Sequence, residues 1–232
     1  MEKLISLKNP NGYHNISDDL GYILILPPST GSKTAIKIFK NFPFSTYELK
    51  NNQIRFVKEG VTHVHNPFLF DGHEKYGLIM TCRNPYSRWV SSFKRNLINM
   101  RFIKSSIDLK EQFHEFILNN VFSQENFKEH MQVELEFSKI AKKVDYFLRI
   151  ENLLEDYKSI PFIEESEFFR NGHLEKVLST PIGHHMSDSS LMLNLFDDWQ
   201  DYYSEESANV LYRILETEFI FYGYDKSSWK KN

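Results

Sequence analysis

The chain has 232 residues, of which 41% are hydrophobic and 25% are charged, and its formal net charge is -3. This balance excludes a globally basic nucleic-acid-binding protein and a polybasic membrane binder, although it allows a local basic pocket. A single cysteine, Cys82, excludes an intrachain disulfide framework and a four-cysteine zinc site.

Residues 1–19 hold no apolar core of signal-peptide length, and no stretch reaches the roughly 20 apolar residues that a membrane span needs. We therefore expect a cytoplasmic protein without a membrane span. Aromatic residues make up 15% of the chain. Because each such ring buries a large apolar area, we expect most of them in the core.

The first predicted strand is the continuous apolar run of residues 22–26 (YILIL), which is typical of a strand buried on both faces of a parallel sheet. Two prolines end it, and a polar turn over residues 29–32 leads into a predicted helix over 33–40. A strand, a tight polar loop and a helix place backbone N–H groups at the helix N-terminus, where anions bind.

Two further strand–helix units follow along the chain. A strand over 76–81 precedes a helix over 86–99, and Pro85 suits the first turn of that helix because its missing N–H costs nothing there. A strand over 144–150 precedes a helix that starts within 151–157.

The remaining segments are predicted to be mostly helical over 108–143, irregular over 159–190 and helical over 204–216. Alternating strands and helices indicate an α/β fold with three layers, in which a mainly parallel central sheet is flanked by helices. Ligands bind such folds at the carboxyl ends of the strands.

The first loop, residues 28–34 (PSTGSKT), combines hydroxyl groups, a glycine and Lys33. The glycine lets the backbone approach an anion, and the lysine supplies positive charge. The loop is not a full Walker A loop, because Ser32 stands where a glycine must precede the lysine. The alternative is a plain turn in which a serine or threonine caps the helix.

The second loop, residues 83–91 (RNPYSRWVS), places Arg83 at the mouth of a helix, with Ser87 and Ser91 one turn apart on one face. An arginine and a serine near a helix N-terminus can clamp a phosphate by charge-assisted hydrogen bonds. In the alternative interpretation, Arg83 pairs with a surface carboxylate and the serines are only solvated.

Four blocks of the sequence together resemble a known family. Residues 83–93 (RNPYSRWVSSF) resemble the 3′-phosphate-binding segment of sulfotransferases that use 3′-phosphoadenosine 5′-phosphosulfate (PAPS), above all the carbohydrate branch with the heparan and chondroitin enzymes. The loop 28–34 sits where that family has its 5′-phosphosulfate loop. Residues 144–157 (VDYFLRIENLLEDY) and the ending 202–224 resemble two further blocks of the family, in the same order.

The resemblance implies a P-loop-like fold and a transfer of a sulfuryl group from PAPS to a hydroxyl acceptor, which is a small molecule or a glycan, with the nucleotide product 3′-phosphoadenosine 5′-phosphate (PAP). It implies no metal and no nucleic-acid partner. Arg83 and Ser91 would hold the 3′-phosphate. The loop residues that would hold the 5′-phosphosulfate are Ser29, Thr30, Gly31, Ser32, Lys33 and Thr34.

The first loop departs from the family at one position. Family members usually carry a lysine that meets the bridging oxygen of the leaving phosphate, and this chain has Ser29 there. Three alternatives stay open: Lys33 reaches the same place from the first helical turn, the loop runs in a shifted register, or the site is impaired.

A histidine pair, His63 and His65, falls where the family's 2-O-sulfotransferase type carries H-x-H, the second histidine of which is the base. By that resemblance His65 is the candidate base and His63 its support or substitute. Histidine suits the task because its ordinary pKa lies near working pH. The alternatives are a metal-binding pair and an ordinary pair of polar loop histidines.

The block 149–156 (RIENLLED) is expected to hold structural ion pairs, with Glu151 and Asp156 as structural carboxylates and Arg149 left open as a cofactor-side residue. The whole chain, 1–232, is expected to be one sulfotransferase-like domain. Segments 102–143 and 159–190 would be insertions that cover the acceptor and the cofactor.

Two other functions remain as alternatives, a P-loop kinase for a small molecule and a non-catalytic nucleotide-binding relative of the sulfotransferase fold. A missing G-K-[ST] sequence counts against the kinase. Animal relatives of this type lie in the Golgi behind a membrane anchor. Because this sequence shows no apolar stretch long enough for such an anchor, we expect a cytosolic enzyme of bacterial or viral origin.

Overall fold

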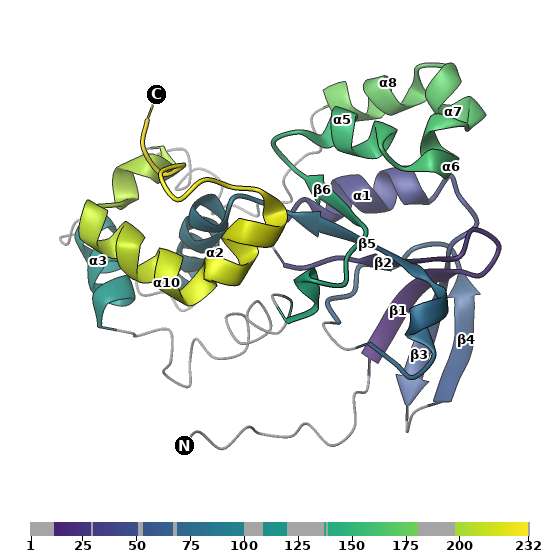
Figure 1. The fold of residues 1–232 in the computed structure, drawn as a ribbon, viewed down its shortest axis with the longest axis horizontal. Coiled ribbons are helices and arrows are strands. Elements are labelled where there is room, and N and C mark those ends of the chain that lie inside the picture. The colour runs from purple at the N-terminus through teal and green to yellow at the C-terminus, as the bar shows by residue number, and fades with distance from the viewer. Residues whose placement is uncertain are drawn as a thin grey trace.

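The structure is a computed structural model, and the residues that it describes are 12–28, 30–50, 53–66, 69–99, 109–119, 137, 139–180 and 198–231. These residues form an α/β fold in which an open, mixed sheet of six strands is flanked by helices (Figure 1).

The order of the strands across the sheet is β4-β3-β1-β2-β5-β6. Their bounds are Gly12–Ser17 for β1, Tyr22–Ile25 for β2, Ser45–Lys50 for β3, Gln53–Glu59 for β4, Gly77–Cys82 for β5 and Tyr146–Arg149 for β6.

The prediction of a mainly parallel sheet is wrong. In the described sheet, the parallel pairings are β2 with β5 and β5 with β6, whereas β1 pairs antiparallel with both β2 and β3, and β3 pairs antiparallel with β4. The connection between β1 and β2 spans only residues 18–21. A connection that short can join antiparallel neighbours but cannot make the crossover that parallel strands require.

The described chain holds helices and 3-10 turns, and the helices labelled in Figure 1 gather in two groups. Their bounds are Ser32–Phe39 for α1, His73–Lys75 for η1, Pro85–Asn99 for α2, Leu109–Leu118 for α3, Leu153–Lys158 for α5, Pro161–Glu164 for α6, Glu167–Arg170 for α7, His173–Ser179 for α8, Trp199–Tyr202 for η4 and Glu205–Tyr222 for α10. In the part of the chain with described structure, no helix is long and apolar enough to cross a membrane.

The two helices predicted after the first two strands are confirmed to within a residue. The prediction of irregular structure over 159–190 is wrong as far as residue 180, because the short helices α6, α7 and α8 occupy that part. The rest of the segment lies outside the described residues. The helix predicted over 204–216 continues to Tyr222, where Gly223 ends it with a positive φ of 72° and Tyr224 N–H donates to the Phe219 carbonyl.

Both faces of the sheet are covered. On one face, sheet residues such as Leu24, Ile79 and Leu148 pack against α1 and the α5–α8 group. On the other, Ile25 and Met80 pack with Tyr222 at the end of α10. A separate aromatic-rich cluster joins α2, α3, η4 and α10, which lie together beside the sheet (Figure 1).

A fully buried ion pair joins α2 to α10. Arg88 Nη2 donates to Glu218 Oε2 at 2.5 Å, and both side chains have 0% exposure. Breaking such a pair by removing one partner leaves a buried charge uncompensated, which typically costs about 3–5 kcal/mol. Arg88, although it belongs to the second loop motif, therefore holds helices together.

His14 on β1 is a buried histidine that the fold keeps neutral. Only 4% of it is exposed, and burial lowers its pKa from the ordinary 6.5 to about 4. Its Nε2 atom lies 2.9 Å from Asn66 Nδ2. Because an amide nitrogen can only donate, the imidazole nitrogen accepts, which requires it to be unprotonated.

This predicts how the free energy of unfolding changes with pH. Between pH 6.5 and about pH 4 the unfolded chain binds a proton at His14 that the folded chain does not, so stability falls as the pH falls through that window. The loss reaches about 3 kcal/mol near pH 4. Urea denaturation at a series of pH values should show this slope in the wild type and a shallower one in His14→Gln. An unchanged slope in the variant would contradict the assignment.

Candidate functional site

The candidate site lies where three parallel strands end. Tyr22 to Ile25 of β2 pair in register with Gly77 to Met80 of β5, and β5 pairs in turn with β6 as far as Cys82 and Arg149. Since parallel strands end at the same edge of a sheet, the segments that follow β2, β5 and β6 meet there. Both predicted phosphate loops are among these segments.

Thr30 ties the first loop to the neighbouring strand. Its hydroxyl donates to the Pro27 carbonyl at 2.7 Å and lies 2.7 Å from the Thr81 hydroxyl of β5. Because the Thr30 hydrogen is already given to Pro27, Thr81 must donate to Thr30. The Thr30 side chain is fully buried, so its hydroxyl serves the loop's shape, and only its backbone remains for an anion.

Gly31 is the N-cap of α1, and no side chain of a described residue caps the helix. The predicted alternative of a serine or threonine cap is therefore wrong. Gly31 has a φ of 78° and a ψ of 21°, a left-handed conformation that favours glycine. The first turn of α1 also contains no acidic residue. Its orphan N–H groups and the positive end of the helix dipole are thus available to an anion.

The histidine pair contacts this loop. Ser32 Oγ lies 2.8 Å from His63 Nε2, and the rings of His63 and His65 meet edge to face with centroids 4.6 Å apart. His65 Nδ1 lies 2.5 Å from the carbonyl oxygen of Leu26, at the end of β2. A carbonyl only accepts, so Nδ1 carries the hydrogen, and the basic lone pair of the neutral ring is on Nε2.

Arg83 in the second loop is held by two serines of α2. Its Nε donates to Ser87 Oγ at 2.7 Å and its Nη1 donates to Ser91 Oγ at 2.9 Å. The alternative in which these serines are only solvated is wrong. The resemblance assigns Arg83 and Ser91 to the 3′-phosphate and gives Ser87 no role. Its position, four residues after Arg83 and four before Ser91, nevertheless predicts this contact.

The N-terminus of α2 differs from that of α1, because protein groups occupy it. Asn84 Oδ1 accepts the Tyr86 N–H at 3.0 Å, and Glu151 Oε1 accepts the Asn84 N–H at 3.1 Å. An anion at this helix would therefore be bound by side chains on its flank, chiefly Arg83. At the end of the helix itself, the N–H groups of Asn84 and Tyr86 already have partners.

Two of the remaining candidate residues, Lys33 and Thr34, lie in the first turn of α1. Lys33 is exposed, and Thr34 is half-buried with its N–H donating to the Gly31 carbonyl at 3.0 Å. Ser29, the position where the family usually has a lysine, lies outside the described residues.

Arg149 at the end of β6 makes a bidentate ion pair. Its Nη2 and Nε donate to Asp156 at 2.5 and 3.0 Å, and its backbone N–H donates to the same carboxylate at 2.7 Å. This pair supports the structural role predicted for Asp156. It fixes the turn between β6 and α5, and Asp156 raises the pKa of Arg149 still further above its ordinary range.

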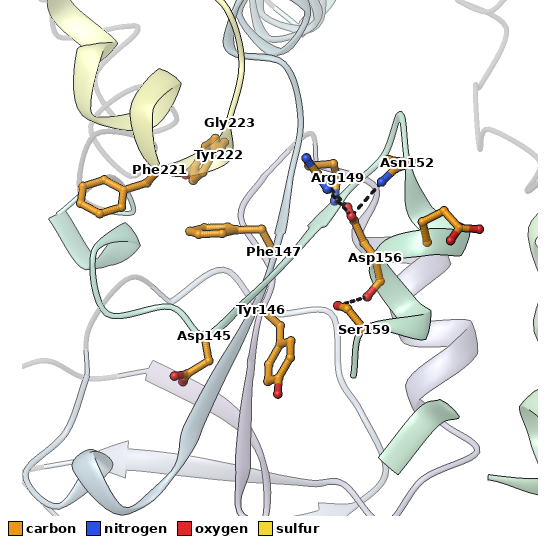
Figure 2. A pocket seen from close by; sticks show the side chains of 11 residues that line it. Asp145, Tyr146, Phe147, Arg149, Asn152, Asp156, Ser159, Phe221, Tyr222 and Gly223 are labelled. Atoms are coloured by element: carbon orange, nitrogen blue, oxygen red, sulfur yellow. Dashed lines mark hydrogen bonds and ion pairs between the residues drawn. The ribbon is translucent and has the colours of Figure 1, made fainter. Parts of the chain in front are cut away.

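A hollow of about 430 Å³ lies beside β6, between α5 and the end of α10. Figure 2 shows Arg149, Asn152 and Asp156 on one side of it and Phe221 and Gly223 on the other. None of its lining residues in the described chain is a predicted phosphate-binding residue. The lining holds three carboxylates and one arginine, and that arginine is already paired with Asp156, so the hollow does not suit a phosphate. The strand ends do.

The part of the chain that the structure describes contains no group of three or more His, Cys, Asp or Glu side chains that could hold a metal ion. Cys82 is buried at the end of β5, and burial raises the pKa of its thiol well above the ordinary value, which keeps it protonated.

Comparisons of the chain with protein-family models, with curated proteins and with solved structures found no match.

The packing around Gly31 gives a test of the first loop. A Cβ at Gly31 would lie 2.6 Å from Ile150 Cγ2, whereas a Cβ at Gly21, also at positive φ, would meet no described atom within 4 Å. Gly21→Ala should cost about 1 kcal/mol from the backbone alone, and Gly31→Ala about 2–4 kcal/mol because overpacking adds to it. Urea denaturation measures both.

The control is the same change made in an Ile150→Ala background, which removes the clashing methyl group. There Gly31→Ala should cost no more than Gly21→Ala does. Equal costs for the two glycine changes in the wild-type background would contradict the close approach of this loop to the segment after β6.

Proposed function

We propose that the protein is a nucleotide-dependent group transferase of the sulfotransferase type, which moves a sulfuryl group from PAPS to a hydroxyl of a glycan or a small molecule. The proposal combines the resemblance of the four sequence blocks with the two anion-binding places at the ends of β2 and β5.

The observation that carries it is that the Arg83 clamp and the start of α1, whose N-cap is Gly31, lie at the same edge of the sheet. PAPS bears a 3′-phosphate and a 5′-phosphosulfate, so its enzyme needs two separate anion sites. The Arg83–Ser87–Ser91 cluster offers one, and the first turn of α1 offers the other. The hydroxyl pair Thr30–Thr81 fixes the first loop to the strand that leads to the second.

The chemistry asked of the protein is positioning and charge stabilisation. PAPS supplies an activated sulfuryl group whose transfer to a hydroxyl releases PAP. The N–H groups of the first turn of α1, together with Lys33, would stabilise the negative charge that develops on the leaving 5′-phosphate. Nε2 of His65 would take the proton of the acceptor hydroxyl, because Nδ1 is already committed to the Leu26 carbonyl.

His63 has a supporting part in this scheme. Its contact with Ser32 links the segment that bears the base to the loop that holds the phosphosulfate. Catalysis needs the base and the leaving group in one fixed geometry, and a hydrogen bond between their two segments provides that.

Binding of PAP tests the nucleotide site. Isothermal calorimetry should show PAP binding to the wild type and a loss of about 100-fold or more in Arg83→Ala, because a charge-assisted pair of contacts to a phosphate is removed. Arg213→Ala, which changes an exposed arginine of α10, should bind as the wild type does. Binding of ATP with Mg²⁺ in place of PAP would indicate the small-molecule kinase and overturn the proposal.

Transfer of labelled sulfate from PAPS tests the catalytic groups. Lys33→Ala should lower the rate by about 10²–10³, and His65→Gln by about 10²–10⁴, while both variants still bind PAP. Lys37→Ala is the matched control, because Lys37 is exposed one turn further along α1. PAP binding without transfer to any of a panel of sugar, lipid and phenol acceptors would favour the non-catalytic relative.

A further inference from the structure

We infer that Glu151 is a positioning residue for Arg83: its carboxylate fixes the backbone beside that arginine, so nucleotide affinity depends on a side chain that never touches the nucleotide. The inference rests on the proposed function, because it assigns a role toward the same 3′-phosphate site.

The contacts of Glu151 are the first observation. It follows β6, and its two carboxylate oxygens are used separately. Oε1 accepts the N–H of Asn84 at 3.1 Å, and Oε2 accepts the hydroxyl of Tyr224. Asn84 is the residue directly after Arg83. The carboxylate therefore holds the peptide from which the Arg83 side chain extends toward its two serines.

The C-terminal segment after α10 supports the same turn. Asn84 Nδ2 donates to Ser228 Oγ at 2.9 Å, and Tyr86 donates from its hydroxyl to the carbonyl of Lys226 at 2.8 Å. Residues 224–228 thus lie against the start of α2, and Glu151 joins them to the segment after β6 through Tyr224. Arg83 is held at its side chain by α2 and at its backbone by these two segments.

Charge makes the inference testable, because the two possible effects of Glu151 have opposite signs. A carboxylate near a phosphate site repels the ligand, so if only its charge mattered, removing it would tighten binding. If its hydrogen bonds hold Arg83 in place, removing it weakens binding, since a displacement of about 1 Å at a binding group can cost as much as 100-fold.

The experiment measures binding of PAP by calorimetry to the full chain and to Glu151 variants. Glu151→Ala should weaken binding about 10-fold. Glu151→Gln should bind at least as well as the wild type, because its amide oxygen can still accept the Asn84 N–H and the repelling charge is gone. Tyr224→Phe removes only the hydroxyl that orients the carboxylate, and should weaken binding about threefold, by less than Glu151→Ala.

A double-mutant cycle identifies the residue through which Glu151 acts. In an Arg83→Ala background, Glu151→Ala should cause no further loss, because there is no guanidinium left to position. Glu155→Ala removes an exposed carboxylate of α5 that pairs with Lys158 and should leave binding unchanged. Thermal unfolding of each variant confirms that it is folded at the assay temperature.

The outcomes separate the two proposals. Normal binding by Arg83→Ala would overturn the proposed function, and this inference with it. Loss of binding in Arg83→Ala combined with unchanged or tighter binding in Glu151→Ala would overturn the positioning role alone. So would a loss in Glu151→Gln as large as that in Glu151→Ala, or additive losses in the double variant.

Discussion

The parallel pairing of β2, β5 and β6 is the constraint on which the candidate site depends. It brings the ends of three strands that are far apart in the sequence to one edge of the sheet, and the Thr30–Thr81 hydroxyl pair locks the first loop to the second strand at that edge. Thr30 is fully buried and Gly31 leaves no room for a side chain against Ile150. The loop is therefore shaped by packing before any ligand arrives, which is the condition for electrostatic preorganisation.

The two helices that begin at this edge would treat an anion differently. The end of α1 has a glycine N-cap and no acidic residue in its first turn, so it would bind an anion with backbone N–H groups. The end of α2 is already satisfied by Asn84 and Glu151, so it would bind an anion with the side chains of Arg83 and its serines. Two anion sites with different donors, backbone N–H groups at α1 and side chains at α2, suit a ligand that carries two different phosphate groups.

The sequence predicts β2, β5 and the helices after them because continuous apolar runs followed by proline or glycine have few other structures available. It does not predict β3 and β4, whose segments STYELK and QIRFVKE are mostly polar; β4 is an edge strand with an exposed Phe56. Helices α6–α8 are too short for a 3.6-residue period to stand out.

At the site, helical spacing predicts that Arg83 and Ser91 share a face. The contact of Glu151 with Asn84 joins residues 67 positions apart, and no local pattern encodes it.

The most direct test of the proposed function is an experimental structure of the protein with bound PAP. We expect the 3′-phosphate against Arg83 and Ser91, and the 5′-phosphate at the N–H groups of residues 31–33, with Nε2 of His65 facing the place that the sulfuryl group would occupy. A nucleotide bound in the hollow beside β6, or with its phosphates away from both α1 and α2, would contradict it.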